Sequence, residues 1–276
     1  MSDTTRLDRL SALLSGLAPR VHMMRPVHAQ DAWAFEAEST PTLWLHLVLA
    51  GRVQVETGGS ETLSIEGPAM LICRADTAHR LVRAAEGAGA ALELLCAKAT
   101  LEGPVAPLLL AEFQRPMVVA LARADASLEQ VIGLVRAELD EPRCGQPLLL
   151  DRAGDILFIG LLRHLIAHTQ SAFGLFNGLA DPRIARTLVA LHASPGNDWR
   201  LESMAEQAGM SRTAFANRFR QALDTTPGRY LARLRLAIAQ RAVASGDGLK
   251  QAARRTGYGN TSALSRALSR ARREVA

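Results

Sequence analysis

The stretch from residue 201 to residue 222 constrains this chain more than any other, because its apolar spacing and its turn residues describe two short helices. The apolar side chains of the first helix recur with helical spacing at Leu201, Met204, Ala205 and Ala208. Gly209 follows directly, and glycine is the residue that turns most easily where a helix ends. Ser211 then offers a hydroxyl to the free amides of a second helix, whose Phe215 and Phe219 form an apolar stripe. The pattern predicts a helix-turn-helix.

The outward face of the second helix carries side chains that can reach base edges or phosphates, and it carries no acid. Asparagine can bond adenine through two hydrogen bonds, and the methyl group of alanine or threonine can pack on thymine. The alternative interpretation is an ordinary solvated helix face. The candidate DNA-binding residues of this unit are Ser211, Arg212, Thr213, Ala216, Asn217 and Arg220.

Two segments resemble the DNA-binding domain of the AraC/XylS family of transcription regulators. The first, LESMAEQAGMSRTAFANRFRQALDTTPGRYLARLRLAIAQ, contains a recognition helix of the form MSR..F...F, then Pro227, Tyr230 and a long helix. The second, KQAARRTGYGNTSALSRAL, resembles the second helix-turn-helix of that family, with Gly257 and Tyr258 at the turn. Two motifs in the right order are more specific than one. The resemblance implies base contacts at Thr213, Ala216 and Asn217, with Arg212 and Arg220 nearer the backbone.

In the second unit, Asn260 is expected to cap the helix, and the residues that follow it are expected to face outward. Arg266 is the candidate for reading guanine, although a surface or phosphate-binding arginine is the alternative. Leucines stand where the family has phenylalanines, and the ending ARREVA lacks the closing Gly, Pro and Tyr-Arg elements, so we expect a short last helix. The candidate DNA-binding residues of this unit are Asn260, Thr261, Ser262, Ala263, Arg266 and Arg270.

A linker helix over residues 227–243 is expected to hold the two units rigidly, so that they enter major-groove faces about 34 Å apart. A DNA half-site should therefore be long and bipartite. Arg233 and Arg235 lie along this helix, where DNA contact, surface charge and an ion pair with Asp224 are all open.

Charge supports a polyanionic partner for the C-terminal part. Residues 181–276 contain 17 Lys or Arg against 7 Asp or Glu, whereas residues 1–180 contain 15 against 20, which gives net charges of +10 and −5. Such a field favours contacts with phosphates and fast association, although it fits any anionic partner.

The N-terminal part has strand character from about residue 32 to residue 97, where apolar residues alternate at period two between tight turns. HLVLAGRVQVE and GPAMLICRADTAH resemble the cupin-type domain of one AraC-like subgroup. The expected fold class is therefore α+β: a cupin-like antiparallel β-barrel followed by helices, then an all-α domain of two helix-turn-helix units. Helices are expected from Pro116 onward, and the domains are expected to span residues 1–178 and 179–276.

The segment 148–169 is apolar around more of its circumference than a solvated helix would be. One face is expected to cover the barrel; the other either binds a second subunit, as AraC-like regulators do, or fills the core of the monomer. The three cysteines show no CxxC pairing, which indicates a reducing compartment. No apolar run reaches the about 20 residues that a membrane span needs, and cytoplasmic localisation is expected.

His46, His79, Cys73 and Cys96 are the candidate effector or redox residues of the N-terminal domain. Metal-binding cupins use a His-x-His pair, a Glu and a later His, but here only His46 and His79 match. A metal would need help from Glu56, Cys73 or Glu93, so we expect no metal and no cofactor. For oxidant sensing, Arg74 or Lys98 next to the cysteines would have to lower a thiol pKa; two buried hydrophobic cysteines are the alternative.

The sequence thus predicts a cytoplasmic, homodimeric transcription regulator that binds specific double-stranded DNA and RNA polymerase and responds to a small-molecule or oxidant effector. An activator is expected, and repression is the open alternative. It predicts no enzyme activity and no membrane partner. One alternative is a metal-dependent cupin enzyme fused to a DNA-anchoring domain. Another is a sequence-indifferent, nucleoid-type DNA binder, which would bind random and cognate DNA alike.

Overall fold

The computed structural model describes residues 8–24, 32–58, 62–84, 92–121, 126–169 and 172–275. The chain packs into two compact units. The helical unit comprises Met1–Ala18, Gly103–Glu112 and Leu165–Ala276, and the sheet unit comprises Pro19–Glu102 and Phe113–His164. Short N-terminal segments therefore pack with the C-terminal helices, so these units do not coincide with the domains 1–178 and 179–276, which stay a prediction.

The sheet unit consists of two antiparallel sheets, as the strand pattern predicts. The five-stranded sheet contains, in spatial order, β1 (Pro19–Met23), β8 (Glu93–Leu101), β3 (Thr42–Ala50), β6 (Ala69–Arg74) and β9 (Met117–Ala120). The four-stranded sheet contains β2 (Ala32–Phe35), β7 (His79–Arg83), β4 (Arg52–Thr57) and β5 (Thr62–Glu66).

The core of the sheet unit lies between the two sheets. Val53 and Val55 of β4 alternate with exposed polar residues and point inward, as period two requires. They pack with Trp44 and Val48 of β3 and with Leu71 of β6 in one hydrophobic cluster. The first eight residues of β3 are all buried, so its outer face is covered as well.

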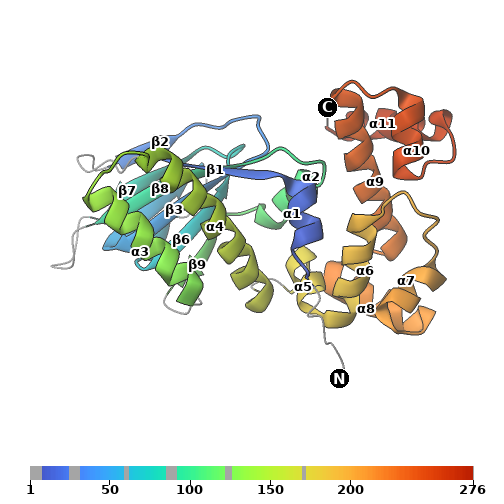
Figure 1. Ribbon diagram of the computed structural model, residues 1–276, viewed down its shortest axis with the longest axis horizontal. Coiled ribbons are helices and arrows are strands. Elements are labelled where there is room, and N and C mark those ends of the chain that lie inside the picture. The colour runs from blue at the N-terminus through green and yellow to red at the C-terminus, as the bar shows by residue number, and fades with distance from the viewer. Residues whose placement is uncertain are drawn as a thin grey trace. The chain divides into compact units, whose positions relative to one another are not determined.

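Helices α3 (Ala126–Asp140) and α4 (Gln146–Ala167) cover that outer face (Figure 1). At the edge strand β1, the backbone amide of Val21 donates to Asp155 (3.0 Å) and that of Met23 to Asp151 (3.1 Å). Elsewhere on α4, Leu148 and Ile156 remain 63% and 52% exposed. One face of α4 therefore packs within its own unit, and the dimer expected from its other face stays a prediction.

The expectation of helix directly after Pro116 is wrong. Residues 117–120 form strand β9, which pairs with β6 through Met117 opposite Ile72 and Ala120 opposite Ala69. The β-branched Val118 and Val119 suit a strand, and their pairing extends the five-stranded sheet. Before β9, the chain forms the short helix α2 (Ala106–Leu110) and the turn η1 (Ala111–Phe113).

The helical unit contains nine of the described helices. In addition to α2 they are α1 (Ser11–Leu17), α5 (Leu175–Ala180), α6 (Pro182–Ala193), α7 (Leu201–Ala208), α8 (Arg212–Leu223), α9 (Pro227–Ala244), α10 (Leu249–Thr256) and α11 (Thr261–Val275). The expectation of a short last helix is wrong, because α11 has 15 residues. Leu264 and Leu268 are buried under α9 and α10, so the leucines supply the packing that phenylalanines would give.

Side chains from two segments that precede α5 in the sequence bind the ends of this helix. The Arg9 guanidinium donates to the carbonyls of Leu179 (3.1 Å) and Ala180 (3.3 Å), which end α5. The Glu112 carboxylate accepts from the amide of Leu175 (2.8 Å), at the start of α5. The free backbone groups at both ends of α5 are thus hydrogen-bonded by residues far away in sequence.

Among the described residues, no helix is long and apolar enough to cross a membrane.

Candidate nucleic-acid interface and histidine–cysteine cluster

Helices α7 and α8 form the helix-turn-helix that the sequence predicts. Gly209 ends α7 in the left-handed region (φ 62°), and the Ser211 hydroxyl accepts from the amide of Ala214 (3.4 Å) at the start of α8. Phe215 and Phe219 are fully buried, with ring centroids 5.5 Å apart. The two phenylalanines therefore fix which face of α8 points outward.

The outward face of α8 carries the predicted DNA-binding residues. Ser211, Arg212, Thr213, Asn217 and Arg220 are exposed, and Ala216 is half-buried. The Arg212 guanidinium lies 2.8 Å from the Glu202 carboxylate of α7 and, with its hydrogen bond, lowers the pKa of Glu202. Arg212 therefore forms an exposed ion pair with α7.

Helices α10 and α11 repeat this construction. Gly257 ends α10 in the left-handed region (φ 71°), and the Asn260 side-chain oxygen accepts from the amide of Ala263 (2.8 Å). Asn260 is thus the cap that the sequence predicts. On α11, Thr261, Ser262, Arg266 and Arg270 are exposed, and Ala263 is half-buried.

The side chain of Arg235 joins the linker helix α9 to both helix-turn-helix units. Its guanidinium donates to the carbonyls of Pro195 (2.8 Å) and Asn197 (2.7 Å), in the loop before α7. It also lies against Gly257, where a β-carbon would come within 2.8 Å of it. Asp224 and DNA were the partners considered from the sequence, whereas the partners are backbone carbonyls, which no side-chain pattern can indicate.

A hydrogen-bonded pair, which the sequence does not indicate, packs against Phe219 of α8. His192 of α6 and Tyr230 of α9 are joined by a hydrogen bond of 2.7 Å between Nε2 and the hydroxyl, and Tyr230 packs against Phe219 at 5.8 Å between ring centroids. Burial lowers the pKa of His192 to about 4 and raises the pKa of Tyr230. The other ring nitrogen of His192, Nδ1, has no hydrogen-bond partner among the described residues.

In the sheet unit, the structure brings all four candidate effector residues together. His46 of β3 and His79 of β7 meet across the two sheets, with their Nε2 atoms 2.8 Å apart. His46 Nδ1 lies 3.1 Å from the Cys96 thiol of β8, and His79 Nδ1 lies 3.1 Å from the Thr77 carbonyl. Cys73 of β6 has its sulfur within 4.8 Å of ring nitrogens of both histidines. Burial lowers the pKa of both histidines.

The cysteines do not have the lowered pKa expected for oxidant sensing. Burial raises the pKa of the Cys73 and Cys96 thiols to about 12. The neighbouring cations are engaged elsewhere, because Arg74 pairs with Asp76 and Lys98 with Glu38. Both thiols are therefore protonated at neutral pH.

Aromatic side chains, which the sequence analysis did not select, pack around the histidines. The Phe35 ring stacks on His79 at 4.9 Å and lies 4.5 Å from His46 between centroids. Trp44 lies beside Phe35, and its buried Nε1 donor has no partner among the described residues. Phe35 is placed by the pairing of β2 with β7, which one sequence does not reveal.

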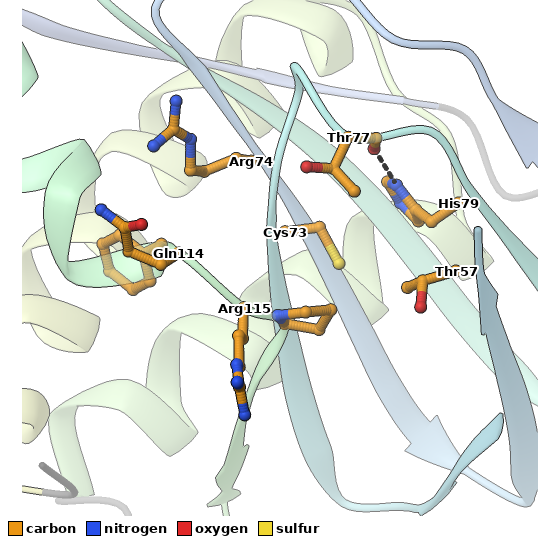
Figure 2. Close-up of a pocket in the computed structure, with 9 residues that line it drawn as sticks. Thr57, Cys73, Arg74, Thr77, His79, Gln114 and Arg115 are labelled. Carbon is orange, nitrogen blue, oxygen red and sulfur yellow. Dashed lines mark hydrogen bonds between the residues drawn. The ribbon is translucent and has the colours of Figure 1, made fainter. Parts of the chain in front are cut away.

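Of the three residues considered as additional metal ligands, only Cys73 lies beside the two histidines. Glu56 pairs with Arg80 and Glu93 with Arg136, both in exposed positions. Cys73 lines a small hollow, with an accessible volume of about 10 Å³, together with Thr57, Thr77 and His79 (Figure 2).

Two helix-turn-helix units on one linker helix, in a chain that also contains an antiparallel double-sheet domain, define a DNA-binding transcription regulator. A cupin family profile matches residues 8–167, and a helix-turn-helix domain profile matches residues 204–274. The chain belongs to the AraC family of transcription regulators with a cupin N-terminal domain.

Relatives agree with this assignment. The chain is 27% identical to a putative AraC-like transcription regulator of Streptomyces lividans over 96% of this chain and 95% of that protein. It is 25% identical to the RCS-specific HTH-type transcriptional activator RclR of Escherichia coli over 84% and 82% of the two chains. Other curated relatives are matched over less than half of their own length.

Among solved structures, the DNA-binding domain of AdpA in complex with a target DNA is 30% identical, with a TM-score of 0.30 over 33% of this chain and 81% of that one. The relatives are transcription regulators, and the chain is a regulator rather than a metal-dependent enzyme fused to a DNA anchor.

Proposed function

We propose that this regulator reads a long, bipartite DNA site through α8 and α11. The observation that carries the proposal is the pair of capped helices whose buried faces leave matching polar faces exposed. Thr213, Ala216 and Asn217 of α8 and Arg266 of α11 would contact bases. Arg212, Arg220 and Arg270 would contact phosphates, which supply affinity without sequence information.

The cupin domain would sense the effector and report it to DNA by favouring one arrangement of two subunits. The hollow beside Cys73 has an accessible volume of about 10 Å³, far below the roughly 300 to 1,000 Å³ typical of ligand pockets. The effector would therefore be small, such as an ion, an oxidant or a compact molecule. Exposed Leu148 and Ile156 on α4 support a homodimer, and the name of RclR, a transcriptional activator, supports activation. Activation would involve contact with RNA polymerase.

The test is selection of genomic fragments by the purified full-length protein, with and without a mild oxidant, followed by sequencing. We expect a long motif with two conserved blocks about one helical turn apart, close to promoters. Retention without any motif would refute specific reading and favour the nucleoid-type alternative. A change of retained fragments with oxidant that disappears in Cys96→Ser would support redox sensing, and an unchanged response would end it.

A further inference from the structure

We propose that His46, Cys73 and His79 form a binding site for one divalent metal ion of the zinc class. The site differs from the ligand set of metal-binding cupins, because a cysteine takes part and a single histidine comes from β3. It needs neither the DNA interface nor a second subunit.

The three ligand atoms are already gathered. The two imidazole nitrogens and the Cys73 sulfur lie within 4.8 Å of one another, and all three side chains are buried. Zinc binds nitrogen at about 2.0–2.1 Å and sulfur at about 2.3 Å, so tetrahedral ligand atoms lie roughly 3.3–3.7 Å apart. The Nε2 atoms, now 2.8 Å apart, would separate by about half an ångström. The ligands come from strands β3, β6 and β7 of both sheets, which hold their backbones in place.

The hydrogen bonds around the histidines prepare one ligand. His79 Nδ1 faces the Thr77 carbonyl and must therefore donate its hydrogen, which leaves Nε2 of His79 without a hydrogen and able to accept a hydrogen bond or bind a metal. A histidine ligand typically donates its second N–H to a carbonyl in this way, which fixes the ring for the metal. His46 Nε2 now donates to His79, so Cys96 donates to His46 Nδ1.

Metal binding would reverse the hydrogen bond to Cys96. His46 would move its hydrogen from Nε2 to Nδ1, and Nδ1 would then donate to the Cys96 sulfur. Cys73 would lose its thiol proton to solvent and bind as a thiolate, so that one proton leaves for each metal ion bound. Cys96 is thus a positioning residue that holds His46.

A disulfide between the two cysteines does not compete with this role. Cys73 of β6 pairs with Trp44 of β3, and Cys96 of β8 pairs with His46 of β3. Strand β3 therefore lies between the two cysteine-bearing strands. Two strand spacings of about 4.8 Å place their backbones about 9.5 Å apart. A disulfide requires α-carbons within about 7 Å.

The donor set and its surroundings select the class of metal. Two imidazoles and one thiolate suit zinc and its neighbours in the transition series and disfavour calcium and magnesium, which prefer oxygen. Figure 2 shows Cys73 and His79 at the hollow that Thr57, Thr77 and Arg115 also line. Three protein ligands leave a fourth position open, and this hollow, with an accessible volume of about 10 Å³, has room for about one water there.

The experiment uses the untagged, reduced, full-length protein after treatment with a chelator, and Co²⁺ as a spectroscopic substitute for zinc. We expect one Co²⁺ per chain, the intense absorption of a thiolate bound to cobalt, and its loss when Zn²⁺ is added. Cys73→Ser should remove the thiolate absorption, and His79→Gln should weaken Co²⁺ binding at least 10-fold. Cys144→Ser, which changes an exposed cysteine, is the matched control and should leave the spectrum unchanged.

The proposal is overturned if the folded wild-type protein binds no Co²⁺, or if the thiolate absorption persists in Cys73→Ser. Circular dichroism establishes that each variant is folded. If Cys73→Ser does not fold, His79→Gln decides alone, because unchanged Co²⁺ affinity in that variant would equally exclude the site.

Discussion

Acid should destabilise the first helix-turn-helix through His192. The unperturbed pKa of this histidine is 6.5, and burial in the folded protein lowers it to about 4. The unfolded chain therefore binds more protons between these two values, and the free energy of unfolding falls as the pH is lowered through this window. The full loss is about 3 kcal/mol, of which about 2 kcal/mol is reached at pH 5. Because His192 bonds Tyr230 beneath α8, this loss should also weaken DNA binding.

The assay compares urea unfolding of the wild type and His192→Gln at pH 7.5 and pH 5, followed by far-UV circular dichroism. Glutamine can place an amide group near the position of Nε2 and keep the bond to Tyr230, but it does not titrate. The wild type should lose about 2 kcal/mol more than the variant on acidification, since the other buried histidines contribute equally to both. His168→Gln, at an exposed position, is the control and should behave as the wild type. Equal losses in the wild type and His192→Gln would refute the reasoning.

Three further experiments test the interface and its support. Arg266→Ala should weaken cognate DNA binding by about 1–3 kcal/mol and leave random DNA nearly unaffected in a fluorescence anisotropy titration; equal losses on both would make Arg266 a phosphate contact. Gly209→Ala should lower the free energy of unfolding by about 1 kcal/mol, because φ at this position is 62°. Gly228→Ala, in helical backbone with open space around it, should raise the free energy of unfolding by about 0.5 kcal/mol. Urea titrations that give the reverse order would contradict this expectation. Arg235→Lys should cost about 1–3 kcal/mol in the same titrations, because one ammonium cannot replace the guanidinium on two carbonyls, while the exposed Arg233→Lys should cost little.

Local chemistry made the helical part of this chain predictable. Gly209, Ser211 and Asn260 mark helix ends by their own conformational preferences, and Phe215 and Phe219 mark the buried face by their spacing. Strand β9 was missed because a four-residue strand is recognised mainly by its partner, and its partner β6 lies more than forty residues earlier.

The histidine–cysteine cluster was predictable in its members and not in its contacts. His46, Cys73, His79 and Cys96 were selected by residue type and by position in a cupin-like pattern. Their meeting depends on which strand faces which across the two sheets, and on the register that sets Cys96 opposite His46. The same dependence explains why burial, and not a neighbouring cation, determines the pKa of the thiols.

The support of the two recognition helices bears on how the protein reads DNA. Arg235 connects α9 to the loop before α7 and lies against Gly257, the turn between α10 and α11. A β-carbon on Gly196 would come within 2.6 Å of the Arg255 carbonyl, so the loop before α7 also packs directly on the second unit. The two units are therefore joined by the linker helix and by this second contact, which limits rotation about α9. A fixed separation of α8 and α11 means that a DNA site with one base pair inserted between its two halves should lose the binding energy of one unit, because that unit would be out of phase with its groove.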